Sequence, residues 1–196
     1  MTATTESEYL IISNKEKATE LLSITEPTEA NIIDAFIALH IILEVSLNTL
    51  FRHISMLSIK KDIDRLEIIK NIDAISFIDK TVLFIYDSKF NFTSIEDATH
   101  YHSTIGVLKD FSSIRNQLLH GHSISTISDE EGTRQSRLKK SLNDEALSGQ
   151  IKKLLFVFEG LRFYVDCLES SLTTSGKAAF KKAYLDDTFI PDRYKR

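Results

Sequence analysis

Cysteine, glycine and proline are scarce in this chain of 196 residues. Its single cysteine cannot form a disulfide framework or a cysteine-rich zinc or iron–sulfur site, and it fits a reducing compartment. Six glycines and two prolines fall well below the average usage of about 7% and 5%, and sheet proteins need those residues for their many turns. The shortage of glycine and proline therefore favours a few long helices. From the single cysteine we expect a protein of the cytoplasm.

Excess positive charge and a signal sequence are also missing. The formal net charge of −4 excludes a broadly basic coat protein for nucleic acid, but it leaves room for a local basic patch. The first eight residues are polar and acidic, unlike a signal sequence. The most apolar stretch, Ile32–Phe51, contains Asp34 and Glu44, and a central carboxylate is costly in a bilayer. We therefore expect a buried helix there and no membrane partner.

Apolar side chains recur at spacings of three and four along most of the chain, which is the period of amphipathic helices. This pattern predicts helices over Ser7–Ser23, Glu29–Leu57, Ser94–Gly121 and Asp144–Leu172, one or two more between Ile63 and Tyr86, and a weak amphipathic stretch over Ala178–Leu185. The hydrophobic content of 42% is ordinary for a soluble globular protein. We predict an all-α, up-and-down bundle of four to five helices in residues 1–173, followed by a C-terminal helical tail, 174–196.

Residues 123–149 interrupt the helical periodicity. Ser, Thr, Asp, Glu and Gly dominate their first part, and a basic run of Arg134, Arg137, Lys139 and Lys140 follows. This composition indicates an exposed, flexible insertion. The four cations form either a solvated surface or a guide for an RNA backbone, and the sequence favours neither.

The common motifs of cofactor and nucleophile sites are absent from the sequence. There is no glycine-rich phosphate loop with its lysine, no His-Glu-x-x-His, no Cys-x-x-Cys and no Gly-x-Ser-x-Gly. Two His-x-His pairs remain, His100/His102 and His120/His122. Residues two apart on a helix point about 200° away from each other, so neither pair makes a two-ligand face on a helix. We expect no metal and no organic cofactor.

The segment from Phe111 to His122 places reactive side chains at the end of an apolar helix. Asn116 and His120 are four residues apart and share a helix face, while Arg115 must reach round with its long side chain. Together they supply a cation for phosphate, an amide to orient it and a proton carrier near neutral pH. These are the parts of a metal-free site that cleaves RNA through its 2′-hydroxyl, with arginine holding the charge of the phosphorane.

An Arg-Asn pair followed after three residues by His and then Gly resembles the motif of the HEPN superfamily, the higher eukaryotes and prokaryotes nucleotide-binding domains. By this resemblance, Arg115, Asn116 and His120 match the family's functional residues in a four- or five-helix bundle. The resemblance implies a metal-independent endoribonuclease that works as a homodimer, with two Arg/His pairs meeting at the interface. It also implies a toxin of a toxin–antitoxin or phage-defence system, with a cognate antitoxin protein as partner.

The family resemblance also gives two candidates for auxiliary residues of the site. His122 stands where a subgroup of the family has a tyrosine that a partner antitoxin modifies, so this sequence departs from that subgroup. An acidic residue on an earlier helix recurs in the family, and Glu44 is the candidate for it here.

Simpler roles remain open for the same residues. Arg115 can pair with Glu44 or Asp110. Asn116 can cap a helix end, and His120 can be a satisfied histidine at a helix C-terminus, where the dipole favours its charged form. Two other functions also remain open: a non-catalytic module of the same bundle that binds a nucleotide or a partner protein, and a purely structural helical protein.

Overall fold

The computed structural model describes residues 6–58, 75, 76, 79, 95–119, 126–129, 132–135, 142–167 and 173–195. These residues contain five α-helices: α1 (Glu6–Ser23), α2 (Glu29–Ser58), α5 (Ile95–Leu119), α7 (Asp144–Cys167) and α8 (Thr174–Tyr184). They also contain two short strands, β1 (Thr126–Asp129) and β2 (Gly132–Gln135), and a 3₁₀ turn over Asp192–Tyr194. The prediction of an all-α bundle is confirmed.

The predicted helix positions agree closely with the structure where it describes them. The first two helices begin and end within one residue of the prediction, and α5 and α7 occupy the ranges predicted for the later long helices. The helices expected between Ile63 and Tyr86 fall almost entirely outside the described residues. The predicted ends beyond Leu119 and Cys167 also lie outside them.

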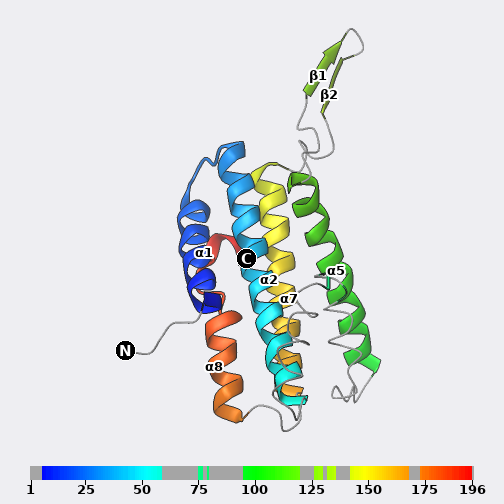
Figure 1. Ribbon diagram of the computed structural model, residues 1–196. Helices are drawn as coiled ribbons and strands as arrows, with labels where there is room; N and C mark the ends of the chain where they lie inside the picture. The colour runs from blue at the N-terminus through cyan, green and yellow to red at the C-terminus, as the bar shows by residue number, and fades with distance from the viewer. Residues whose placement is uncertain are drawn as a thin grey trace.

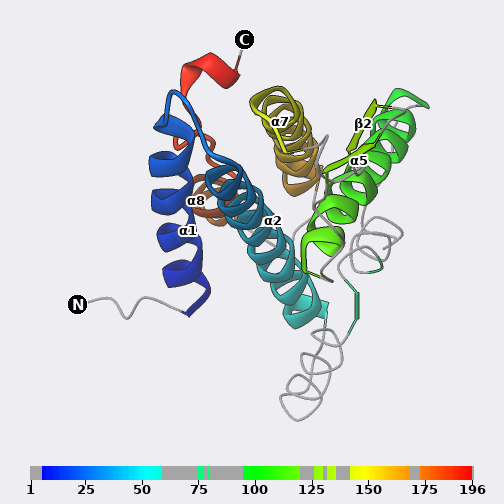
Figure 2. The ribbon, with the colours of Figure 1, turned by 90° about the horizontal axis from the view of Figure 1, so that it is seen from above.

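Helix α2 lies at the centre of the bundle. Figure 2 shows it between α1 on one side and α5 and α7 on the other, and α1, α5, α7 and α8 all contact it. Leu39, Ile42 and Leu43 are fully buried along its length. Burial of one such side chain stabilises the fold by about 1.5–3 kcal/mol relative to exposure. The uninterrupted apolar spacing of this helix therefore specifies the core.

A reciprocal cap starts α2. The Thr28 backbone N–H donates to Asn31 Oδ1 at 3.0 Å, and the Asn31 N–H donates to the Thr28 hydroxyl at 3.3 Å. The first N–H groups of a helix have no hydrogen-bond partner within the helix. Here each of the two side chains accepts a hydrogen bond from the backbone N–H of the other residue. The cap fixes where the chain leaves the loop after α1.

The segment Glu29–Arg52 is long and apolar enough to cross a membrane by length and composition, with a mean hydropathy of 1.8. Buried helices of a bundle pass the same test, and 56% of this apolar window is buried inside the structure. The signal is accounted for by the central position of α2 in the core.

A small hairpin lies within the insertion at 123–149. Strands β1 and β2 pair antiparallel, from Thr126 opposite Gln135 to Asp129 opposite Gly132. Figure 1 shows the hairpin projecting beyond the end of the bundle near α5, so it adds no sheet to the core. The sequence pattern did not predict it, although Thr126, Ile127 and Thr133 are β-branched and favour strands.

The segment that the sequence sets apart as a tail is packed into the bundle. Six of its side chains are buried in the core: Phe180, Tyr184, Leu185, Phe189, Ile190 and Tyr194. The Ser46 hydroxyl donates to the Tyr184 carbonyl at 2.8 Å, and Arg193 Nη2 donates to the carbonyls of Leu22 and Ile24. Residues 174–195 therefore close the bundle on the side of α1, α2 and α7.

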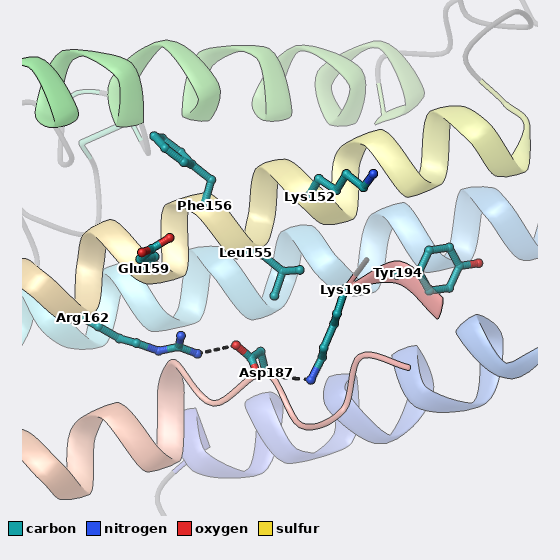
Figure 3. Close-up of a pocket in the computed structure, with 8 residues that line it drawn as sticks. All are labelled: Lys152, Leu155, Phe156, Glu159, Arg162, Asp187, Tyr194 and Lys195. Carbon is teal, nitrogen blue, oxygen red and sulfur yellow. Dashed lines mark hydrogen bonds and ion pairs between the residues drawn. The ribbon is translucent and has the colours of Figure 1, made fainter. Parts of the chain in front are cut away.

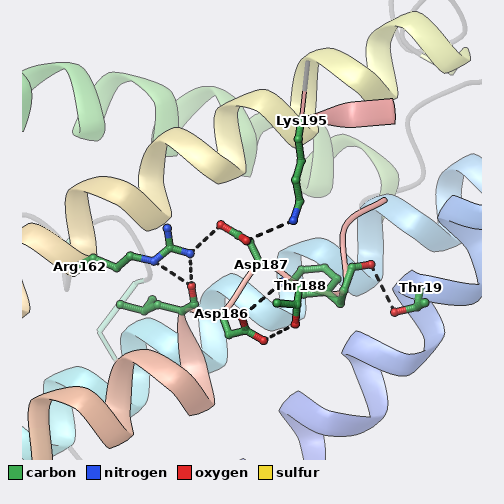
Figure 4. Close-up of polar contacts among 8 residues, drawn as sticks. Thr19, Arg162, Asp186, Asp187, Thr188 and Lys195 are labelled. Carbon is green, nitrogen blue, oxygen red and sulfur yellow. Dashed lines mark hydrogen bonds and ion pairs between the residues drawn. The ribbon is translucent and has the colours of Figure 1, made fainter. Parts of the chain in front are cut away.

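A charged cluster fastens this segment to α7 (Figure 4). Arg162 donates from Nε and Nη2 to the Leu185 carbonyl at 3.1 and 2.6 Å, and from Nη2 to Asp187 Oδ2 at 2.7 Å. Lys195 Nζ donates to the other carboxylate oxygen of Asp187 at 3.3 Å. Thr19 on α1 donates to the Phe189 carbonyl at 3.3 Å. Three parts of the chain far apart in sequence are thereby joined.

We expect Asp187→Asn to reduce the loss of stability in acid. Burial alone raises the pKa of Asp187, but the hydrogen bond and charge of Arg162, with help from Lys195, outweigh burial and lower the pKa below its usual 3.8. A lowered pKa gives a contribution to stability that is present above pH 3.8 and is lost as the pH falls through the pKa of the folded state.

Urea unfolding midpoints measured between about pH 5 and pH 2 check this expectation. The wild type should lose more stability across that range than the Asp187→Asn variant. Asp192→Asn, which changes an exposed carboxylate of the same segment, is the matched control and should follow the wild type. An identical acid dependence of all three proteins would contradict a role for the Asp187 charge.

Candidate functional site

Arg115 and Asn116 lie near the C-terminal end of α5 and begin on different faces of it. Leu108, Ser112 and Arg115 follow one another at spacings of four and three, so they share one face. Leu108 and Ser112 are buried, so this face points into the bundle, and Arg115 itself is half-buried. Asn116 is exposed. The arginine stem therefore starts toward the interior, which the sequence analysis did not predict.

The guanidinium of Arg115 returns to the outer face and meets the neighbouring amide. Arg115 Nη1 donates to Asn116 Oδ1 at 3.0 Å. Because arginine only donates hydrogen bonds, the amide oxygen must face it, and the Asn116 NH₂ group then points away. The pair presents N–H donors from two side chains at one end of the helix.

No ion pair between Arg115 and a carboxylate occurs among the described residues. Asp110 instead pairs with Lys153 of α7, with Oδ2 and Nζ 3.4 Å apart. Glu44 lies 3.4 Å from Nε2 of His40, one turn earlier on α2. The two simple pairings considered for Arg115 are thus not formed. The positive charge of Arg115 remains available for an anion.

The other predicted site residues are placed only in part. His120 and His122 lie outside the described residues, as do Arg137, Lys139 and Lys140. The backbone of Arg134 is in β2, opposite Ile127 of β1. Nothing that the structure describes brings Glu44 next to Arg115. Within the described part of the chain, no group of three or more His, Cys, Asp or Glu side chains is placed to hold a metal.

A pocket of about 550 Å³ lies between α7 and the C-terminal segment (Figure 3). Its lining consists of Lys152, Leu155, Phe156, Glu159, Arg162, Asp187, Tyr194 and Lys195. No sequence pattern predicts this pocket, because its two walls are far apart in the chain and only the fold brings them together. Arg162 and Lys195 both point to Asp187 in Figure 3, so most of its charges already satisfy one another.

The tyrosine of this pocket is also held by its neighbours. The Tyr194 hydroxyl donates to Asp144 Oδ1 at 3.0 Å and accepts from Arg193 Nη2 at 2.9 Å. Burial raises the pKa of Tyr194 above its usual 10.0, and the Asp144 carboxylate acts in the same direction. The phenol thus joins Asp144, the first residue of α7, to the C-terminal segment. Of the two features, only the end of α5 contains residues of the motif that the sequence singled out, and its arginine has no carboxylate partner among the described residues.

Compared with models of protein families, with curated proteins and with solved structures, the chain matches none of them. Any function proposed for the chain therefore rests on the sequence motif and on the geometry of α5 alone.

Proposed function

We propose that this chain is a metal-independent endoribonuclease of the HEPN type that acts as a homodimer in the cytoplasm. The observation that carries the proposal is the Arg115–Asn116 pair at the end of a bundle helix, joined at 3.0 Å and without a carboxylate partner among the described residues. His120 follows Leu119, the last residue of α5, directly in the sequence. The motif thus combines a cation, an amide and an imidazole within six residues.

Each of the three side chains has a chemical role in the proposed reaction. His120 takes the proton from the 2′-hydroxyl or delivers one to the leaving 5′-oxygen. Arg115 binds the non-bridging oxygens of the phosphate and stabilises the negative charge that the phosphorane gains. Asn116, whose oxygen is engaged by Arg115, donates from its NH₂ group and orients the scissile phosphate.

A second copy of the chain completes the proposed site. One helix end offers two donor side chains on one side of a phosphate, and a surface facing it is needed to exclude water and fix the geometry. Closed two-fold dimers are the commonest way for a chain to supply such a surface to itself. Light scattering at tens of micromolar should show a dimer, and a monomer at that concentration would contradict this part of the proposal.

The insertion provides a path for the RNA backbone in this proposal. The β1–β2 hairpin projects near the end of α5 (Figure 1), and Arg134 lies in it. Arg137, Lys139 and Lys140 follow it in the sequence. Phosphate contacts by such side chains are independent of base sequence and weaken steeply with salt.

The cellular role that accompanies this activity is that of a toxin or a phage-defence protein, held in check by a cognate antitoxin.

Cleavage of a single-stranded RNA in excess chelator tests the proposal. The wild type should produce fragments that end in a 2′,3′-cyclic phosphate or a 3′-phosphate, because the 2′-hydroxyl is the nucleophile. The same substrate with 2′-deoxy sugars should remain intact. If the RNA is not cleaved but a nucleotide binds and is lost on Arg115→Met, the chain is instead a non-catalytic binding module. If the chain neither cleaves RNA nor binds a nucleotide, it is a purely structural helical protein.

A further inference from the structure

Three polar atoms are buried on α5 and α7, two helices that contact each other. They belong to Ser112, Arg115 and Gln150, and we call these residues the inner polar cluster. Ser112 is 5% exposed and Gln150 is 7% exposed. Ser112 Oγ, Arg115 Nε and Gln150 Oε1 are each buried without a hydrogen-bond partner in the part of the chain that the structure describes. Buried polar atoms are costly to leave unbonded, so three of them on two contacting helices call for an explanation.

The register of the two helices brings these atoms to nearly the same height. Helices α5 and α7 run antiparallel (Figure 1), and the Lys153–Asp110 bridge at 3.4 Å ties them together. At about 1.5 Å per residue, Arg115 lies about 7.5 Å and Ser112 about 3 Å above Asp110, counted along α5. Gln150 lies about 4.5 Å above Lys153 on α7, by the same rise. Its height is therefore between those of the other two residues.

The three atoms are also complementary in chemistry. Arg115 Nε–H can only donate, Gln150 Oε1 can only accept, and the Ser112 hydroxyl can do either. We infer that Gln150 is a positioning residue for Arg115: its Oε1 accepts from Arg115 Nε–H, and the Ser112 hydroxyl donates to the same oxygen. Neither bond is formed in the structure as described, so both require these side chains to rotate about their own torsions. This inference rests on the proposed function for its catalytic consequence, but not for the bonds themselves.

Two anchors then define the plane of the guanidinium. Gln150 holds Nε–H from the inside, and Asn116 Oδ1 holds Nη1 from the outside at 3.0 Å. Of the five N–H groups of arginine, three remain for phosphate oxygens. A guanidinium that is fixed before the substrate arrives loses less freedom on binding, and it meets the phosphate in one orientation. Gln150 on α7 thereby determines how Arg115 on α5 acts.

Hydrogen exchange of the Arg115 Nε–H, followed by NMR on the full chain, tests the bond directly. The wild type should exchange slowly, and Gln150→Leu, which keeps the size but removes the acceptor, should exchange at least about tenfold faster. Gln150→Glu retains an acceptor and should keep the proton protected. Gln117→Leu makes the same chemical change at a half-buried position of α5, where Gln117 Nε2 donates to Ser113 Oγ at 3.2 Å, and should behave as the wild type.

The catalytic consequence is measured on the same proteins. Gln150→Leu should lower kcat for RNA about tenfold with little change in melting temperature, because a displaced guanidinium affects the transition state more than the fold. If Gln150→Leu is poorly folded, Gln150→Met gives the same test, because it also removes the acceptor oxygen and keeps an unbranched side chain of similar length. Fast exchange in the wild type, or unchanged exchange in Gln150→Leu, overturns the inference whether or not RNA is cleaved. Slow, Gln150-dependent exchange in a protein that cleaves no RNA supports the bond and overturns only the proposed function.

Discussion

Replacement of Arg115 by Met is expected to lower RNA cleavage by about 100-fold or more, the scale of losing a key charge donor. His120→Ala should have an effect of similar size, about 10²-fold, because it removes the group that moves the proton. Arg115→Lys should also lower the rate of RNA cleavage. An ammonium group lacks the planar fork that pairs with two phosphate oxygens, and lysine has no Nε–H to face the inner polar cluster. Single-turnover cleavage in excess chelator is the measurement for all three variants.

Thermal unfolding of the same variants separates a catalytic role from a structural one. The stem of Arg115 begins on the buried face of α5, next to Leu108 and Ser112, so truncation to Ala would leave a void. Met fills the space of the stem and is the better replacement, and we expect its melting temperature to fall by only a few degrees, roughly 1 kcal/mol. A purely structural Arg115 would show the opposite result, with a loss of stability and no activity to lose. Cleavage at the wild-type level by Arg115→Met or His120→Ala would end the catalytic proposal.

The long helices were predictable because their information is local. Over Glu29–Ser58 there is no glycine or proline, and apolar residues keep the helical spacing, so composition and period agree. The start of this helix was predicted from the Pro27-Thr28 pair, either residue of which favours a helix start, and the structure shows Thr28 forming the cap with Asn31. For such segments the tertiary structure adds packing but does not change the local conformation.

The inner polar cluster could be predicted only in part. The spacing of Leu108, Ser112 and Arg115 is visible in the sequence and would have placed the arginine on the buried face. Gln150 is different, because its partners lie on a helix that precedes it by more than thirty residues. No local pattern distinguishes a glutamine that faces a cation across two helices from one that faces solvent. The antiparallel register of α5 and α7, which brings them together, is a property of the fold alone.

The C-terminal segment was underestimated for a related reason. Phe180 and Tyr184 are four residues apart and stack, with ring centroids 5.0 Å apart, so the helix period detects them. Phe189, Ile190 and Tyr194 follow without that period, because residues after Tyr184 form turns and a 3₁₀ helix. Their burial depends on contacts with α1 and α7 rather than on a repeating face. Irregular segments of this kind read as tails in a sequence even when they belong to the core.

Removal of residues 174–196 is accordingly expected to unfold the bundle. The deletion takes away six buried side chains, Phe180, Tyr184, Leu185, Phe189, Ile190 and Tyr194. At about 1.5–3 kcal/mol each, their burial contributes on the order of 10 kcal/mol as an upper estimate. The whole stability of a domain is about 5–15 kcal/mol. The deletion would also expose the apolar faces of α1, α2 and α7 that these side chains cover, and it would leave Arg162 without its partners Leu185 and Asp187.

Circular dichroism and urea unfolding of residues 1–173 and of the full chain measure this effect. The shortened chain should lack a cooperative transition. Deletion of only residues 195 and 196 is the control, because it keeps every buried side chain and removes the surface pair of Lys195 with Asp187, which is worth at most about 1 kcal/mol. If residues 1–173 show a cooperative transition with a urea midpoint close to that of the full chain, the bundle folds without the C-terminal segment. The segment from Thr174 onward would then be an appendage, as its sequence pattern first indicated.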